Sequence, residues 1–216
     1  MGAKVVGAGT DEIQIDGVKK LKDVSYNIMS DRIETGSFLC FVAATKGNAI
    51  LENVNGTHIT PIINKLEEAD CKIRLDKNKI EIAAPKKLKA VDIKTMPYPG
   101  FPTDMQSVMA SMLTTAKGTS IIIENIFENR YKYTQELNRM GAKITIEGKS
   151  AIIRGTRKLY GTNVKATDLR GGAALVLAGL IAKGSTKIDN IEYILRGYEN
   201  LDEKLRKLGA NIEVEK

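Results

Sequence analysis

Three aspartates occupy equivalent positions in three apolar segments, and their surroundings could bind an anionic substrate. Each aspartate follows a hydroxyl residue, in the pairs Ser30-Asp31, Thr103-Asp104 and Thr167-Asp168. Ser and Thr are typical N-caps of helices, and an adjacent Asp suits the positive end of the helix dipole. Helix capping is therefore sufficient to explain any one of these pairs.

Arginines near the pairs point beyond capping, to an anion-binding cleft. A helix N-terminus offers free N–H groups and positive potential, which bind phosphate or carboxylate, and Arg binds the same groups through two parallel hydrogen bonds. Arg170 lies two residues after Asp168. Arg130 in IFENRYKY and Arg196 in LRGYE lie between a strand-like run and a helix in equivalent loops of a repeat. Singly, each is more simply a surface arginine, but the repeat predicts that both face one cleft.

The loop that precedes Asp104 is rich in proline. Pro97, Pro99 and Pro102 lie in the segment TMPYPGFPTDMQ, and each proline fixes its own φ angle. The loop would therefore deliver Asp104 to the start of a helix with little conformational freedom. A stiff connector without a functional role is the alternative.

A repeat with a period of about 70 residues must position these groups. Each copy has an apolar helix, expected to run to Lys46, Lys117 or Lys183, and then a strand-like run: AILENV, SIIIENI or TKIDNI. An amphipathic helix follows and closes at a C′ Gly or Asp, where a left-handed residue ends a helix. A strand pair completes the copy, in KIRLDKNKIEIA and KITIEGKSAIIRG, but NIEVEK offers one strand only.

The predicted fold class is α/β, with the apolar helices inside and the sheets outside. Helices that are apolar on every side are fully buried, and superposed repeats should place the three helices parallel to one another. We expect an inside-out α/β barrel lobe of about three pseudo-threefold repeats, over residues 31–97, 98–166 and 167–216. Residues 1–30 match only the end of a repeat, so we expect an absent N-terminal part to supply the missing strand.

Composition narrows the classes of function. The chain has 216 residues and a net charge of +7, but its lysines are scattered and aromatic residues make up 5%. A basic, non-enzymatic module that binds nucleic acid is one hypothesis, although a stripe of lysines and a stacking platform of aromatic residues are both missing.

No apolar stretch is long enough to cross a membrane and no signal-peptide pattern is visible, so we expect a cytoplasmic protein with no membrane partner. Cys40 and Cys71 lie in apolar segments and are expected to be buried free thiols, and the single His58 argues against a zinc site.

Four segments, in their order and spacing, resemble a known enzyme family: PYPGFPTDMQ, IFENRY, ATDLRGGAALVLAG and RGYENLDEKLRKLGANIE. They are similar to the C-terminal half of the UDP-N-acetylglucosamine 1-carboxyvinyltransferases, the enolpyruvyl transferases of bacterial peptidoglycan synthesis. GAGTDEIQIDGV and SDRIETGSF extend the similarity to the first residues. The sister enzyme that makes enolpyruvylshikimate phosphate is an alternative, but it fits less well at PTDMQ and ENRY.

The resemblance implies two lobes and an addition–elimination reaction. Residues 1–30 would end the second lobe, and residues 31–216 would form most of the first. The 3-hydroxyl of UDP-N-acetylglucosamine attacks C2 of phosphoenolpyruvate while C3 is protonated, and phosphate then leaves. Such chemistry needs a base, an acid and cationic groups around the phosphate and carboxylate, and no cofactor.

The resemblance also implies roles for individual residues. Asp104 matches the residue that contacts the sugar hydroxyl and is proposed as the base. The other matches are to substrate-binding positions: Asp168, Arg170 and Arg196 at phosphoenolpyruvate, and Ile126, through its backbone, with Arg130 at the nucleotide sugar.

Two departures from the family pattern limit what this chain could do alone. The general-acid Cys of the family lies on a loop of the other lobe, and neither Cys40 nor Cys71 is in that motif. The N-terminal Lys-Asn pair that binds phosphoenolpyruvate has no counterpart either. We therefore expect an incomplete active site that needs the missing N-terminal half, and self-association of the isolated chain through its exposed face and strand edge.

Overall fold

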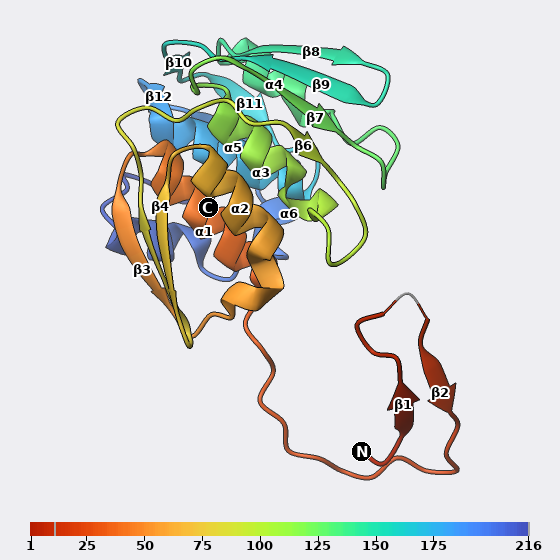
Figure 1. Cartoon of the computed structure of the whole chain (residues 1–216). Helices are drawn as coiled ribbons and strands as arrows, with labels where there is room; N and C mark the ends of the chain where they lie inside the picture. Colours follow the sequence, from red (N-terminus) through yellow and green to blue (C-terminus); the bar gives the residue numbers. More distant parts are fainter. Residues whose placement is uncertain (11, 216) are drawn as a thin grey trace. The chain divides into compact units, whose positions relative to one another are not determined.

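Among the described residues of the first 30, two short strands form one pair. The computed structural model describes residues 1–10 and 12–215, and the chain divides into two compact units, Met1–Ser30 and Asp31–Lys216. In the first unit, β1 (Lys4–Val6) pairs antiparallel with β2 (Gln14–Asp16) (Figure 1). This pair is the one expected from the match between the first residues and the end of a repeat.

Three buried helices form the centre of the second unit. They are α1 (Arg32–Ala44), α3 (Gln106–Leu113) and α5 (Leu169–Ile181), and each contacts the other two (Figure 1). Every residue of α3 is buried, as is the run from Gly171 to Ala178 in α5. The expectation of buried apolar helices is confirmed.

Contacts between these helices show that they run in the same direction. The Ser107 hydroxyl donates to the carbonyl of Arg170, and the Ser111 hydroxyl, one turn later, donates to the carbonyl of Ala174, both at 2.7 Å. The partners advance together along both helices, so α3 and α5 are parallel. On the other side, Ser37 of α1 contacts Met105 and Cys40 contacts Met109. This register makes α1 parallel to α3, and the predicted parallel arrangement is confirmed.

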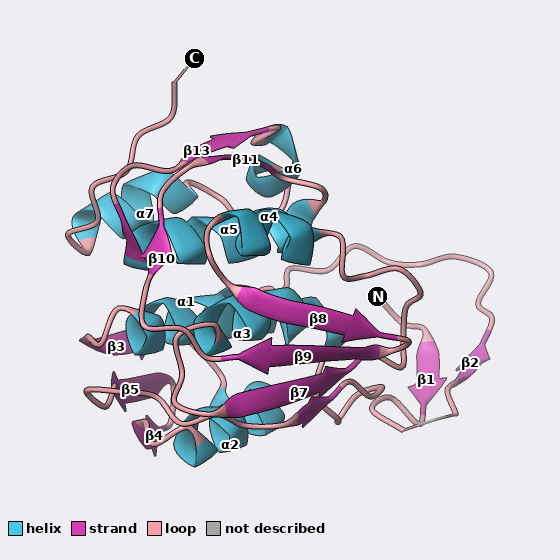
Figure 2. Ribbon diagram, turned by 90° about the horizontal axis from the view of Figure 1, so that it is seen from above, coloured by secondary structure: helices cyan, strands magenta, loops and turns pink. Residues whose placement is uncertain are grey.

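Each central helix packs against a different set of strands. Helix α1 contacts β3 (Asn48–Glu52) and β5 (Lys79–Ala83), which form an antiparallel sheet with β4 (Lys72–Asp76). Helix α3 contacts β7 in a sheet of four strands, ordered β6 (Ile93–Lys94), β7 (Thr119–Ile123), β9 (Ser150–Arg154) and β8 (Lys143–Glu147) (Figure 2). Helix α5 contacts strands of two short parallel pairs: β10 (Leu159–Tyr160) with β12 (Ala182–Lys183), and β11 (Asn163–Lys165) with β13 (Lys187–Asp189).

The α/β class is therefore confirmed, whereas the closed barrel is not. Over the described residues the strands form five separate sheets, none of which closes on itself. A further difference concerns residues 211–215, which were expected to contain a strand but have no regular structure. A strand requires a hydrogen-bonded neighbour, and none pairs with this segment within the described part of the chain.

The amphipathic helices end as the sequence predicts. They are α2 (Thr60–Glu68), after a 3₁₀ turn at Gly56–Ile59, α4 (Tyr133–Arg139) and α7 (Leu201–Lys207), and a short α6 (Glu192–Leu195) precedes α7. Asp70, Gly141 and Gly209 follow their C-caps with φ values of 73°, 95° and 94°. The central helices end two to four residues before the expected lysines, because Lys46 (φ 60°) has already left the helical conformation, Lys117 pairs with Lys89 in a parallel β-bridge and Ala182 is extended.

The cysteines and the lengths of the helices bear on two further expectations. Cys40 and Cys71 are buried free thiols, as predicted, and burial raises the pKa of Cys71 to about 11. Among the described residues, no helix combines the length and apolar character that crossing a membrane requires.

Two glycines of α5 differ in the space around them and provide a test of the packing. A Cβ on Gly172 would lie 2.5 Å from Cγ1 of the buried Ile194, whereas a Cβ on Gly179 would meet nothing closer than 3.4 Å. We predict that Gly172→Ala lowers the free energy of unfolding by about 1–3 kcal/mol, because it overpacks the contact between α5 and α6. Gly179→Ala, the matched control, should be neutral or stabilising by up to about 1 kcal/mol, because Ala favours a helix over Gly. Urea unfolding measures both, and equal effects would contradict the close approach.

Candidate functional site

Asp104 lies between two arginines at the start of α3. Its Oδ1 accepts a hydrogen bond from Nη2 of Arg130 at 2.7 Å, and its Oδ2 accepts one from Nη2 of Arg170 at 3.0 Å. Both guanidinium groups are largely buried, and the Asp104 side chain is 38% exposed. The carboxylate therefore joins the first turn of α5 to the loop before α4, and it is reachable from solvent.

The two arginines control the charge of Asp104. Burial by itself raises the pKa of this carboxyl, but the charge of Arg170 and the charged hydrogen bond from Arg130 outweigh burial, so that the pKa lies below its ordinary value. Asp104 is thus ionised at neutral pH. One donor in this cluster has no partner, because Nη1 of Arg170 is buried without a hydrogen bond among the described residues.

The other two aspartates have the simpler role that the sequence allowed. Oδ1 of Asp168 accepts hydrogen bonds from the backbone N–H groups of Arg170 (3.0 Å) and Gly171 (2.8 Å). Asp31 accepts in the same way from the N–H of Ile33 at 2.7 Å. Both are N-caps, so the caps are the aspartates and not the preceding Ser or Thr. Asp168 therefore occupies two of the N–H groups at the start of α5, which are then not available to an anion.

Asp104 differs because a 3₁₀ turn (Thr103–Met105) replaces the cap at the start of α3. The cap position of this turn is Pro102 and the cap position of α3 is Met105, and neither residue makes a capping hydrogen bond through its side chain. The Asp104 carboxylate is consequently turned toward the arginines of two other segments.

A tyrosine connects this cluster to α1. The Arg170 guanidinium lies over the ring of Tyr198, with its carbon 5.6 Å from the ring centroid. The Tyr198 hydroxyl is 2.8 Å from the Ser37 hydroxyl in α1. Tyr198 is buried, which raises its pKa, so it remains a neutral hydrogen-bonding group. Neither Tyr198, in the motif LRGYE, nor Ser37 could be predicted from the sequence as part of the site, since neither residue type signals an anion site.

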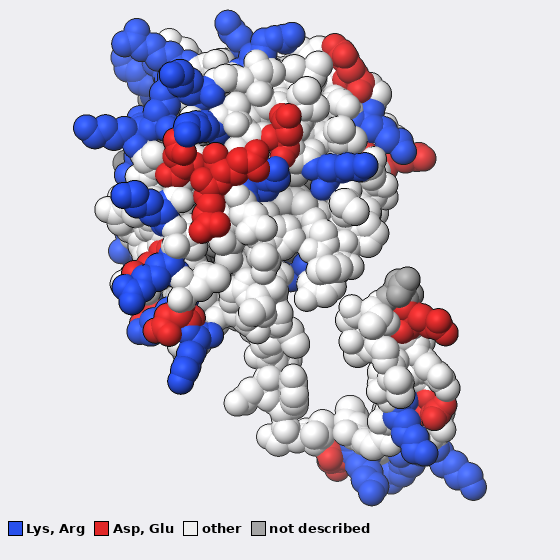
Figure 3. Space-filling view, in the orientation of Figure 1, with Lys and Arg blue, Asp and Glu red and all other residues white. Residues whose placement is uncertain are grey.

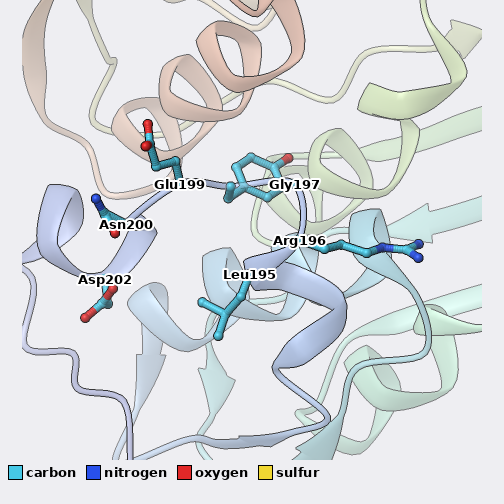
Figure 4. Close-up of a pocket in the computed structure, with 7 residues that line it drawn as sticks. Leu195, Arg196, Gly197, Glu199, Asn200 and Asp202 are labelled. Atoms are coloured by element: carbon cyan, nitrogen blue, oxygen red, sulfur yellow. The ribbon is translucent and has the colours of Figure 1, made fainter.

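Arg196 approaches the cluster without joining it. Its neighbour Gly197 packs against Leu169, the first residue of α5, where a Cβ would lie 2.6 Å from Leu169 Cδ2. Arg196 contributes to a cavity of about 520 Å³ between α6 and α7, but its side chain extends away from Asn200 and Asp202 (Figure 4). Its guanidinium instead lies over the ring of Tyr193. In the described residues no hydrogen bond or ion pair joins it to Asp104 or Asp168.

A buried glutamate, missed in the sequence analysis, fixes the two loops that meet at Asp104. Glu124, at the end of β7, is 2% exposed. Its Oε1 accepts from the Thr95 hydroxyl and its Oε2 from the Thr103 hydroxyl, both at 2.8 Å. These contacts hold the two ends of the proline-rich loop.

Glu124 fixes the second loop through its backbone. The N–H groups of Ile126 and Phe127 donate to its Oε1 at 2.8 and 3.2 Å. The N–H of Ile126 is therefore occupied within the chain, although the residue as a whole is 38% exposed. One carboxylate thus positions both the loop that carries Asp104 and the loop that carries Arg130.

This arrangement predicts a large effect of a small substitution. In Glu124→Gln the amide nitrogen must face donors, so at least one buried hydrogen bond is lost, and we expect a loss of about 1–3 kcal/mol in the free energy of unfolding. Glu81→Gln, on the exposed face of β5, should change it by less than about 0.5 kcal/mol. Urea unfolding of both variants checks this, and equal stability would show that the carboxylate charge is not needed to hold the loops.

Comparison with known proteins places the chain in a family. The model of the family EPSP synthase (3-phosphoshikimate 1-carboxyvinyltransferase) matches residues 1–215. Curated relatives carry a different substrate in their names. The chain is 54% identical over 213 residues to a UDP-N-acetylglucosamine 1-carboxyvinyltransferase of Desulfofundulus thermocisternus, covering 98% of this chain and 88% of the relative. It is 56% identical over 212 residues to UDP-N-acetylglucosamine 1-carboxyvinyltransferase 1 of Caldanaerobacter subterraneus subsp. tengcongensis, but spans only 51% of that protein's length.

Solved structures agree with this assignment. The enolpyruvyl transferase NikO from Streptomyces tendae superposes with a TM-score of 0.83 at 26% identity, over 98% of this chain and 51% of that one. EPSP synthase from Acinetobacter baumannii shares the fold, with a TM-score of 0.80 at 22% identity, over 100% of this chain and 53% of that one. The chain therefore belongs to the enolpyruvyl transferase family, and the two curated relatives compared above are named UDP-N-acetylglucosamine 1-carboxyvinyltransferases.

Proposed function

We propose that this chain contributes to transfer of the enolpyruvyl group from phosphoenolpyruvate to the 3-hydroxyl of UDP-N-acetylglucosamine, with release of phosphate. This reaction is the first committed step of peptidoglycan synthesis and would take place in the cytoplasm. The names of the curated relatives support this substrate pair. Those relatives also weigh against the alternative of a nucleic-acid-binding module.

The ionised Asp104 between two arginines is the observation that carries the proposal. A carboxylate that contacts a sugar hydroxyl can accept its proton, and guanidinium groups can bind the phosphate and carboxylate of the second substrate. Proton acceptance by Asp104 and anion binding by Arg170 are coupled here, because the two side chains form an ion pair. A substrate anion that draws Arg170 away from Asp104 removes the positive charge that lowers the pKa of Asp104. Binding of phosphoenolpyruvate would thereby make Asp104 a stronger base when it is needed.

The remaining site residues take roles around this pair. Arg170 and Arg196 would bind phosphoenolpyruvate, and Asp168 would hold the first turn of α5 so that Arg170 is positioned. Arg130 would lie near the nucleotide sugar, with Ile126 contacting it through the backbone. Since the N–H of Ile126 is bonded to Glu124, its carbonyl is the backbone group available for that contact. The side chain of Arg196 must turn from Tyr193 to reach the cluster.

We also propose that the chain holds an incomplete active site. Residues 1–30 would belong to the second lobe of the family fold and residues 31–216 to most of the first lobe. The general-acid Cys and the Lys-Asn pair of the family would come from the N-terminal half, without which the chain would be inactive and would associate with itself.

Phosphate release tests the proposal. The 216-residue chain, given phosphoenolpyruvate and UDP-N-acetylglucosamine, should release no phosphate above background, and addition of the N-terminal half of a close relative should restore release. Asp104→Asn should abolish the restored activity, while Asp23→Asn, at an exposed position in the first unit, should leave it unchanged. Full activity of the chain alone would overturn the incomplete site. Stabilisation by shikimate 3-phosphate but not by UDP-N-acetylglucosamine in a thermal shift assay would favour the sister enzyme.

A further inference from the structure

A second cavity lies at the opposite end of the three central helices. Its volume is about 340 Å³, and part of its wall comes from the last residues of α1 and α5, Ala44 and Ile181, and from Thr115 just after α3. Since the three helices are parallel, their C-terminal ends meet here, and Asp104 and Arg170 lie at their N-terminal ends. This cavity is therefore separate from the candidate active site.

Cationic side chains surround the cavity. Five line it, all on exposed residues, and no acidic residue is among its lining: Lys46, Lys86, Lys87, Arg157 and Lys158. In the described part of the chain none of the five forms an ion pair with an Asp or Glu. Figure 3 shows Lys and Arg side chains gathered at the upper left of the molecule, over the region where Figure 1 places β10 and β12.

The helix ends do not balance this charge. Each helix C-terminus carries at most about half a negative elementary charge, so the three together offset fewer than two of the five positive charges. The rest repel one another across a small hollow, and this repulsion costs folding free energy unless an anion enters. Compensation of the helix dipoles alone therefore explains only part of the cluster.

Two short loops, one with Lys86 and Lys87 and the other with Arg157 and Lys158, carry four of these cations and are fixed to the core. Lys87 precedes Leu88 and Lys158 precedes Leu159, in equivalent places of two repeats, and both leucines are buried. The carbonyl of Leu88 accepts from the N–H of Lys117 at 2.7 Å. The N–H of Thr156 donates to the carbonyl of Thr114 at 2.7 Å. Two short loops thus hold their cations on backbone that is already ordered, which lowers the entropic cost of binding.

We propose that this cavity binds a multiply phosphorylated anion, with two or three consecutive phosphates. A single phosphate or carboxylate can engage two or three cations at most, whereas a diphosphate or triphosphate presents enough charges to engage all five. The volume lies at the lower end of the range for small-molecule sites, about 300–1,000 Å³. Such an anion could be a free polyphosphate or nucleotide, or the diphosphate of a nucleotide sugar.

Calorimetric titration of the chain with inorganic triphosphate, in about 0.15 M salt, tests the proposal. One triphosphate should bind per chain. The double variant Lys87→Glu/Arg157→Glu should weaken binding at least tenfold, or about 1.4 kcal/mol. The control Lys72→Glu/Lys143→Glu makes the same change in net charge at exposed strand positions outside the cavity, and should weaken binding much less. If the glutamate variant does not fold, Lys87→Met/Arg157→Met replaces it.

Two further measurements distinguish binding in this cavity from binding at the candidate active site and identify the class of ligand. Arg170→Gln should leave triphosphate binding unchanged, so loss of binding in that variant would place the ligand at the candidate active site and overturn the proposal. Equal weakening by the cavity and control variants would show attraction by net charge only and would overturn it too. Titration with UDP-N-acetylglucosamine distinguishes the sources: binding that the cavity variant weakens identifies a nucleotide sugar as a ligand, and binding that it leaves unchanged restricts the cavity to free polyphosphates and nucleotides.

Discussion

The parallel packing of α1, α3 and α5 decides where the charged groups of this chain can act. Three buried helices in one direction place all their positive ends on one side and all their negative ends on the other. Hydrogen bonds from Ser107 and Ser111 to carbonyls of α5 hold this register inside the core. The acids and arginines of the candidate site then meet at the positive ends, and lysines and an arginine surround the negative ends.

Within the candidate site, positions that are equivalent in the repeat have acquired different functions. Asp31 and Asp168 satisfy free N–H groups of their own helices, which stabilises the helix start. At Asp104, the equivalent position of the middle repeat, a 3₁₀ turn takes the place of the cap, and the carboxylate instead pairs with Arg130 and Arg170. The buried Glu124 makes this difference stable, because it fixes both the loop before Asp104 and the loop that carries Arg130.

Much of the fold could be predicted from the sequence, because periodicity and repetition are local signals. The apolar character of the central helices predicts their burial, and the repeat predicts their common direction. The left-handed residues Asp70, Gly141 and Gly209 are recognisable from residue type and position. The site was less predictable, since the partners of Asp104 lie 26 and 66 residues away. The prolines before Asp104 set this aspartate apart from the two caps in the sequence, but they do not show which side chains it meets. Glu124 lies in the strand-like run SIIIENI, and its role could not be predicted from that run, because its hydrogen-bond donors come from two loops.

Titration of the Asp104 carboxyl by ¹³C NMR shows whether the two arginines set its charge. We expect a pKa below the ordinary value of about 3.9 in the native chain, and an upward shift in Arg170→Gln. Because the pKa is lowered by folding, the stabilisation that Asp104 provides should be complete at neutral pH and should be lost as the pH falls through its folded-state pKa. A native pKa at or above the ordinary value, unaffected by Arg170→Gln, would show that the arginines do not control this carboxylate.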